Sequence, residues 1–521
     1  MVVCALLFGL ALLVPSTARA TDAQETQETQ ETQEMQETQQ EGPTPQYKTL
    51  DELEGKHIAY VNGSVYNQNV QKKISGTSED FYASLADCVA AVEAGKADAA
   101  VQLSYCCQLV VNRKGGSVAL VPDPIDPVQE AFFFPKGSPL KEQFNEVLAK
   151  LKEDGTLDLL AEKWVGKDDD VKTLPEQDWE APNGTLKFAT SGVIEPFSYV
   201  GKGGKPMGYD VELALLIAKE LGYHLDTSTI AMDAIFASVQ SGKVDFGGTL
   251  TNTPERSEMV DFSDRVMDTY ISAVVKSEAG ATDSGGFLAG IKRSFEKTFI
   301  EESRWRMIAH GLLVTIAISV FSGLFGVLLG VGTVFARRSS VGWLHKLVHV
   351  YQTIVGGVPM VVVLMVLYYV LFGSVDIPGE IVAIIAFSLA FGSTSGATMW
   401  SAVQGIDVIQ EETGLALGYT SWQVFRKIIF PQARIRFTPQ LMAQFVSLVK
   451  ETSIVGYIAV EDLTRASDLI RARTMDAFFP LISTAIIYFV FCRFLAWVLA
   501  KIANRINGAD GHPTKLKGVE Q

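Results

Sequence analysis

Residues 412–431 read ETGLALGYTSWQVFRKIIFP and carry the most specific signal in the sequence. Four positions set the spacing of this segment, namely Glu412, Gly418, Ile428 and Pro431. The pattern predicts a helix, a glycine turn and a second helix closed by proline. Glycine accepts the left-handed conformation of a sharp turn, and proline interrupts helical hydrogen bonding. Such a hairpin is a rigid knob that can sit in a cleft on a partner protein.

Long apolar stretches flank this segment on both sides. They lie at 307–335, 347–372, 381–400, 438–460 and 478–500. Each is long enough to cross a hydrocarbon core of about 30 Å. Lysine and arginine follow the first, third and fifth stretches, and these residues favour the cytoplasmic side. We therefore expect an all-α membrane domain of about five spans at 303–505, with a cytoplasmic tail at 506–521 and the preceding residues outside the cytoplasm.

The residues before the spans alternate short apolar strands with amphipathic helices. Strands are expected at 56–61, 98–103, 185–191 and 244–250. This alternation is typical of α/β folds in which helices cover a parallel sheet. A stretch rich in Asp, Pro and Glu divides the region, so the predicted units are 48–166, a linker at 167–184, 185–280 and a second linker at 281–302.

The N-terminus carries two segments without core-forming character. Residues 1–20 are a short apolar run that ends in Ala18-Arg-Ala20, which predicts a signal peptide, with an uncleaved anchor as the alternative. Residues 21–47 are dominated by the polar repeat QETQETQETQ. Because this repeat buries too little apolar surface to offset its ordering entropy, we expect a disordered tether.

Composition excludes several functions. The 521 residues include 44 Lys and Arg against 59 Asp and Glu, a formal net charge of −15. Nucleic-acid binding depends on cationic residues that neutralise phosphates, so no nucleic-acid partner is expected. The sequence has no phosphate loop of the form GxxxxGKS or GxxxxGKT, so ATP hydrolysis by this chain is not expected. No Cys/His spacing predicts a metal site, and no cofactor is expected.

The hairpin at 412–431 resembles the coupling loop of ABC importer permeases, whose pattern is EAA, three residues, G, nine residues and I-x-L-P. The spacing is kept, while Thr413, Gly414 and Phe430 replace the two alanines and the leucine. Two further motifs are similar to the polar amino acid branch of these permeases, namely Gly357-Val-Pro359 and Lys450-Glu-Thr-Ser453.

This resemblance implies a set of partners and a location. A separate ATP-binding cassette subunit would grip Glu412, Gly418, Ile428 and Pro431, and a second permease copy would complete a homodimer. The other expected partners are membrane lipid and a small-molecule substrate. The expected location is the plasma (inner) membrane, with the α/β segments extracytoplasmic.

The α/β segments resemble the periplasmic binding proteins of the same branch, but in reversed order. Residues 48–165 are similar to the second lobe with its terminal helices, and 185–276 are similar to the first lobe. First-lobe motifs are Glu195-Pro-Phe197, Gly208-Tyr-Asp210, Thr253-Pro-Glu-Arg256 and Asp261-Phe-Ser263. The expected fold is thus a circularly permuted, two-lobed α/β receptor followed by the membrane domain. A decayed tandem of two receptors is the alternative.

Permutation makes geometric predictions that a decayed tandem does not. The two strands that cross between lobes, Glu130-Ala-Phe-Phe-Phe134 and Tyr270-Ile-Ser-Ala-Val274, should pair, because otherwise their backbone groups stay unsatisfied. The second of these strands should then lead toward the membrane. The helices at 138–164 should pack on the lobe built from 185–276, and Ser64 and Arg256 should face one cleft.

The resemblance also implies a ligand site. Arg256 would bind a ligand carboxylate bidentately, and a surface salt bridge with Glu255 or Glu258 is the alternative. Thr251 would supply a hydroxyl, and the amide of Thr249 a further donor. Gly63 and Ser64 would donate from the other lobe, at the start of a helix. Phe197 is either a ligand contact or part of the core.

Some family groups are missing from this chain. The carboxylate that receives the ligand ammonium should fall near Leu103, and the two aromatics that sandwich the side chain align with Ile194 and Met232. One alternative is therefore a degenerate receptor that no longer binds free amino acids.

Two further classes share the two-lobed fold: cleft enzymes such as dehydratases, and ligand-gated channels. An enzyme needs an acid or base in the cleft, and a channel has no use for a cytoplasmic knob that fits an ATPase. We therefore favour a membrane subunit of an ABC uptake system with a fused receptor for a polar amino acid or related solute, and no enzymatic activity of its own.

Overall fold

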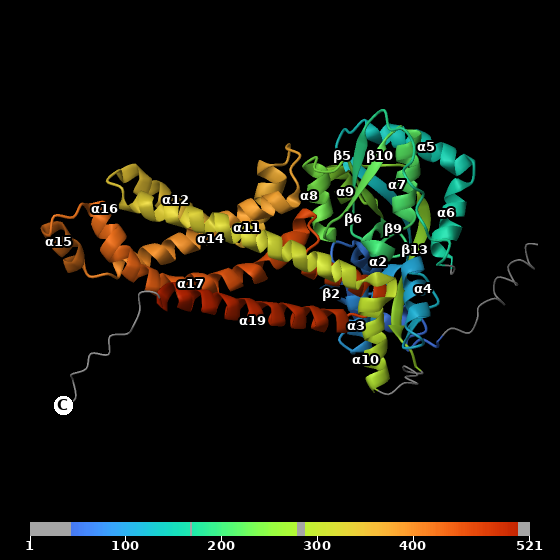
Figure 1. Cartoon of the computed structure of the whole chain (residues 1–521). Coiled ribbons are helices and arrows are strands. Elements are labelled where there is room, and N and C mark those ends of the chain that lie inside the picture. Colours follow the sequence, from blue (N-terminus) through green and yellow to red (C-terminus); the bar gives the residue numbers. More distant parts are fainter. Residues whose placement is uncertain (1–42, 167–168, 279–286, 509–521) are drawn as a thin grey trace, which may run out of the picture.

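The computed structural model describes residues 43–166, 169–278 and 287–508. An α/β body lies at one end of an elongated helical bundle (Figure 1). The expected signal peptide at 1–20, most of the tether at 21–47 and the tail beyond residue 508 lie outside the described residues.

One mixed sheet runs through the whole α/β body. Its strands are β1 (His57–Val61), β2 (Ser78–Tyr82), β3 (Ala99–Leu103), β4 (Val118–Leu120), β5 (Asp126–Pro135), β6 (Thr185–Thr190), β10 (His224–Thr229), β11 (Phe246–Thr251), β12 (Val260–Phe262) and β13 (Met267–Lys276). The order is β10-β6-β11-β5-β13-β3-β1-β2, with β12 against β5 and β4 against β13. Strands β10, β6 and β11 form a parallel block in the first lobe. Strands β3, β1 and β2 form a parallel block in the second lobe. A small antiparallel sheet of β7 (Val193–Ile194), β8 (Ser198–Val200) and β9 (Pro206–Met207) lies beside the first lobe.

The long antiparallel strands β5 and β13 join the two lobes. The two predicted crossover segments lie in these strands, but their register differs from the expected one, since Glu130 is opposite Met267 and Asp126 is opposite Ile271. Residues 271–275 pair with β3 instead. The expectation that 270–274 leads straight toward the membrane is wrong, because Ile271, Ala273 and Val274 are fully buried in the second-lobe sheet.

Helices cover the sheet, namely α2 (Tyr66–Lys73), α3 (Leu85–Glu93), α4 (Ser104–Arg113), α5 (Leu140–Glu153), α6 (Thr156–Val165), α7 (Tyr209–Glu220), α8 (Ile235–Gln240) and α9 (Pro254–Met259). Both α5 and α6 contact α7 of the other chain segment. The Phe144 ring lies 4.7 Å from that of Phe246, and Trp164 Nε1 donates to Glu212 at 2.6 Å. The helices at 138–164 thus pack on the lobe built from 185–276, as predicted. The two halves form one two-lobed body.

The linker at 167–184 has no helix or strand in its described part. Its Gln177 side chain bonds the backbone of Leu225 on β10, and Trp179 Nε1 donates to the carbonyl of Tyr223 at 2.9 Å. This stretch is therefore fastened along the edge of the first lobe. The expected linker at 281–302 is helical where it is described, with α10 (Phe287–Phe295) and a π-helical turn (Glu296–Ile300).

The bundle contains α11 (Trp305–Arg338), α12 (Gly342–Gly357), α13 (Met360–Met365), α14 (Gly379–Gln404), α17 (Phe430–Glu451), α18 (Leu463–Thr474) and α19 (Phe479–Gly508). Among the described residues, three helices, namely α11, α14 and α19, are long and apolar enough to cross a membrane. A fourth candidate is the pair Gly342–Gly357 and Met360–Leu371, which is bent by 108°. Length and composition therefore support three or four spans among the described residues, fewer than the five expected. Helix α17, the expected fourth span, is too polar, since it contains Gln440, Gln444, Lys450 and Glu451.

The 412–431 hairpin differs from expectation at its second helix. Helix α15 (Val408–Ala416) is followed by a turn at Gly418, whose φ is +84°, and then by α16 (Ser421–Val424). Proline does not close this second helix: Pro431 stands in the first turn of α17, directly after a π-helical turn at Phe425–Ile429. A proline is tolerated at such a helix start because its missing N–H is not needed there.

Candidate functional site

A small cavity of about 40 Å³ lies between the two lobes. It adjoins the ends of β1, β3, β6 and β11, and α/β folds bind their ligands at this edge of the sheet. Its polar lining includes Ser64, Gln102, Glu130, Asp210, Thr249, Thr251 and Arg256. That volume admits only a few water molecules. The lobes must therefore part before a solute can enter.

Arg256 ties the two lobes together. Its Nη1 donates to the carbonyl of Thr251 at 2.9 Å, and its Nη2 donates across the cleft to the carbonyl of Gly63 at 2.6 Å. The guanidinium lies over the ring of Phe236 and the residue is 6 % exposed. Arg256 therefore faces the same cleft as Ser64 and is not in a surface salt bridge with Glu255 or Glu258. Two of its donors hold backbone carbonyls in this closed state.

The two threonines expected to serve a ligand instead bond carboxylates of the chain. The amide and the hydroxyl of Thr249 both donate to Asp210 Oδ2, at 3.0 and 2.8 Å. The hydroxyl of Thr251 donates to Glu130 Oε1 at 2.6 Å. The amide of Thr249 is thus already engaged.

Four further residues named from the sequence line the cavity. The hydroxyl of Ser64 is buried and has no hydrogen-bond partner among the described residues. Phe197 is 2 % exposed and packs near the rings of Tyr105 and Tyr209, so it belongs to the core as well as to the cavity wall. Ile194 and Met232 stand where family aromatics were expected.

Sequence reasoning missed two buried acids in the cleft. Burial raises the pKa of Glu130 and that of Asp210 to about 7 each, although their hydrogen bonds from Thr251 and Thr249 act in the opposite direction. One oxygen of Asp210, Oδ1, is buried without a partner in the described structure. Both acids lie within motifs quoted from the sequence. The sequence pattern did not predict that their side chains point into the cleft.

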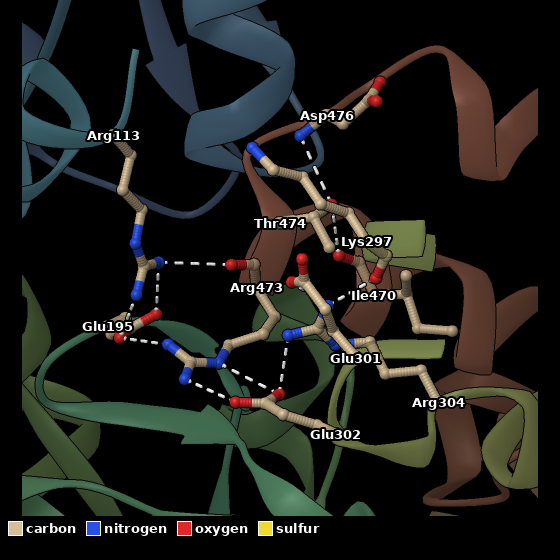
Figure 2. Close-up of polar contacts among 10 residues, drawn as sticks. All are labelled: Arg113, Glu195, Lys297, Glu301, Glu302, Arg304, Ile470, Arg473, Thr474 and Asp476. Carbon is tan, nitrogen blue, oxygen red and sulfur yellow. Dashed lines mark hydrogen bonds and ion pairs between the residues drawn. The ribbon is translucent and has the colours of Figure 1, made fainter. Parts of the chain in front are cut away.

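A run of alternating charges joins both lobes to the helical bundle (Figure 2). Arg113 of the second lobe bonds both oxygens of Glu195 in the first lobe, at 2.7 Å each. Arg473 of α18 bonds the same carboxylate at 2.5 Å and Glu302 at 2.7 Å. Glu302 in turn accepts from Arg304 at 2.6 Å, just before α11. One buried carboxylate, that of Glu195, therefore links an arginine of the second lobe to an arginine of the bundle.

Known proteins match the two parts of the chain. The model of bacterial extracellular solute-binding proteins, family 3, matches residues 186–453, about half of the 521 residues. The L-cystine transport system permease protein TcyB of Bacillus subtilis is 31 % identical over 211 residues, which are 40 % of this chain and 90 % of that protein. The arginine transport system permease protein ArtQ of Bacillus subtilis is 26 % identical over 208 residues, 39 % of this chain and 94 % of that protein.

A solved structure, described as an amino acid ABC transporter with histidines, is also similar. It has 26 % identity and a TM-score of 0.38, over 43 % of this chain and 99 % of that one.

The two-lobed body and the permease-like helices define a solute receptor fused to the permease subunit of an ABC importer. The chain belongs to the bacterial extracellular solute-binding proteins of family 3, and its helical part belongs with the amino-acid ABC transporter permeases.

Proposed function

We propose that this chain imports a polar amino acid across the plasma (inner) membrane. The receptor-like body captures the solute outside the cell, and the helices provide the route inward. The observation that carries this proposal is that one chain combines a polar inter-lobe cleft with helices related to permeases whose names include L-cystine, arginine and glutamine.

The cleft chemistry supports an amino acid as the solute. Arg256 is the guanidinium for the carboxylate, with the hydroxyls of Ser64 and Thr251 beside it. Glu130 and Asp210 are the acids that ionise beside the ammonium, a role that the sequence could not assign near Leu103. When the lobes part, the Arg256 bond to Gly63 breaks and frees a donor for the solute.

The 412–431 hairpin is the proposed contact with a separate ATP-binding cassette subunit. It lies at the end of the bundle remote from the α/β body (Figure 1). Large apolar side chains are exposed on it, including Leu417 at 72 % and Trp422 at 53 %. Clustered exposed apolar residues favour a protein contact. Glu412, Gly418, Ile428 and Pro431 would form or shape this contact.

The proposed assembly is a homodimer of this chain with an ATPase dimer, because the transport path of such permeases lies between two copies. Arg337 and Arg338 end α11 at the hairpin end of the bundle, which favours the cytoplasm on that side. The C-terminus would then be cytoplasmic and the receptor extracytoplasmic.

A second candidate is a degenerate receptor that admits no free amino acid, and the 40 Å³ cavity with its engaged donors favours it. A thermal-shift screen of the full chain in lipid nanodiscs against the twenty L-amino acids and L-cystine separates the two. If the chain imports amino acids, one set of chemically related amino acids should raise the melting temperature of the wild type. The same amino acids should not raise the melting temperature of Arg256→Ala. If none of them shifts the wild type, the degenerate receptor replaces the proposal.

A further inference from the structure

A second polar cavity lies where both lobes meet the helical bundle. Its volume is about 140 Å³. The second lobe contributes Asn62 and Asp87, the first lobe Met232 and Asp233, and the bundle Arg465 and Asp468, among other residues. We call it the junction cavity. Cavities of about 150 Å³ hold a molecule the size of benzene, so it can take a small solute.

The junction cavity and the inter-lobe cleft are immediate neighbours. Asn62 and Met232 line both of them. The two side chains come from opposite lobes, and a Cβ at Gly63, next to Asn62, would lie 3.6 Å from Met232 Cγ. Parting of the lobes would therefore separate this pair and connect the two cavities. A solute that leaves the cleft here meets the bundle.

The lining of the junction cavity carries both signs of charge, with an acidic excess. Arg471 is neutralised, since it bonds Asp468 at 2.9 Å and also bonds Asp87. Asp462 caps α18 through the amide of Arg465, at 2.9 Å. Asp233 is exposed and its carboxylate has no hydrogen bond among the described residues. The carboxylate of Asp233 attracts Arg465 through space, and its oxygens remain open to hydrogen bonds from a cation.

Arg465 provides the opposite charge. It is 8 % exposed, and its Nη2 donates to the carbonyls of Ser191 and Ile230 at 2.6 and 3.0 Å. Its Nε is buried and has no partner in the described part of the chain. An unpaired donor on a buried guanidinium is costly unless another group satisfies it. A carboxylate in the junction cavity is such a group.

We propose that the junction cavity is a second binding site for a zwitterionic or cationic amino acid, occupied after the solute leaves the inter-lobe cleft. Asp233 receives the ammonium and Arg465 receives the carboxylate. The site rests on the proposed function, because the import of an amino acid supplies its ligand. The bundle thereby takes part in solute recognition at its outer end.

Calorimetry on the full chain in lipid nanodiscs, with L-arginine, L-glutamine and L-cystine as separate titrants, tests this site. For a titrant that binds, the wild type should give two binding events. Asp233→Asn should remove the second event or weaken it by about tenfold, the effect of losing about 1.4 kcal/mol. Arg256→Ala should remove the first event and keep the second. Asp226→Asn, an exposed carboxylate of the same lobe on β10, is the matched control and should keep both.

A single event that Arg256→Ala abolishes and Asp233→Asn leaves unchanged would overturn the junction site while the proposed function stands. Absence of binding by all three titrants would overturn the junction site for these solutes, and the thermal-shift screen of all twenty amino acids would then decide the proposed function. Arg465→Lys is a second variant, because it keeps the charge but moves the donors. It should weaken the second event selectively, and an unaltered second event would count against the role of Arg465.

Discussion

Arg473 of α18 and Glu195 of the first lobe form an ion pair at 2.5 Å, on a carboxylate that is 3 % exposed. The same carboxylate also binds Arg113 of the second lobe. One buried anion thus holds two cations from different parts of the molecule. Glu195 is therefore one of the residues that fix the lobes on the bundle, beside the bonds of Arg471 to Asp87 and of Arg465 to Ser191.

The first prediction concerns Glu195→Gln. Removing this charge leaves the partly buried guanidiniums of Arg113 and Arg473 without their shared carboxylate. Breaking a buried ion pair typically costs about 3–5 kcal/mol, and the partial exposure of the two arginines places the expected loss at the lower end of that range. We expect a lower melting temperature of the full chain and faster protease cleavage within 169–184, next to the receptor. The matched control is Glu220→Gln, an exposed carboxylate of the same lobe on α7. Equal melting temperatures for Glu195→Gln and the control would mean that the network contributes nothing to docking.

The second prediction concerns Arg256→Ala. Losing a charge-assisted contact in a desolvated cleft costs about 2–5 kcal/mol, so the affinity for the bound amino acid should fall at least about tenfold. Calorimetry at a fixed pH measures this change. Arg265→Ala, an exposed arginine of the same lobe paired with Asp268, should bind as the wild type does. Unchanged affinity in Arg256→Ala would restrict Arg256 to holding the lobes closed.

Much of the architecture follows from the sequence, because strand and helix alternation and long apolar runs report burial directly. The order of the two lobes was readable from motifs such as Thr253-Pro-Glu-Arg256. The register of β13 could not be predicted from the sequence. Residues 271–275 of β13 pair with β3 in the second-lobe sheet, and their apolar side chains are buried there. By length and composition alone, α17 does not qualify as a span among the described residues, because it is apolar only in part.

The sequence predicted which residues line the cleft, but it did not predict the hydrogen bonds that those residues form. Arg256 and Ser64 do line the same cleft, but Thr249 and Thr251 bond Asp210 and Glu130. Such pairings depend on long-range closure of the two lobes, which local patterns do not encode. A replacement for an alanine of the coupling-loop pattern does have a structural reason: a Cβ at Gly414 would lie 2.8 Å from Val424, so glycine permits the close packing of α15 on α16.

The third prediction concerns the coupling hairpin. Any substitution at Gly418 strains the backbone because its φ is +84°, so Leu417→Arg, at a 72 % exposed position, is the cleaner change. A charge there should prevent docking of the ATPase subunit, abolish transport and leave solute binding intact. Copurification with the ATPase and uptake assays measure these effects. Leu159→Arg, at a 66 % exposed position in the receptor, is the matched control. Normal transport by Leu417→Arg would place the ATPase contact elsewhere.

The fourth prediction is a pH dependence of stability set by Glu130. Burial raises the pKa of this carboxyl from 4.5 to about 7 in the folded chain. The folded state therefore keeps the proton that the unfolded state loses near pH 4.5. The resulting stabilisation is complete below that pH and is lost as the pH rises through about 7. A pKa shift of that size corresponds to about 3 kcal/mol.

Glu130→Gln should thus raise the melting temperature relative to the wild type at pH 8 and have little effect at pH 4.5, because the amide oxygen still accepts from Thr251. Melting curves of both proteins between pH 4.5 and 8 measure the difference. Glu146→Gln, an exposed carboxylate on α5, should follow the wild-type curve throughout. A difference between Glu130→Gln and the wild type that stays constant with pH would mean that Glu130 does not change its protonation over this range. The cleft would then hold a fixed charge rather than a titrating one.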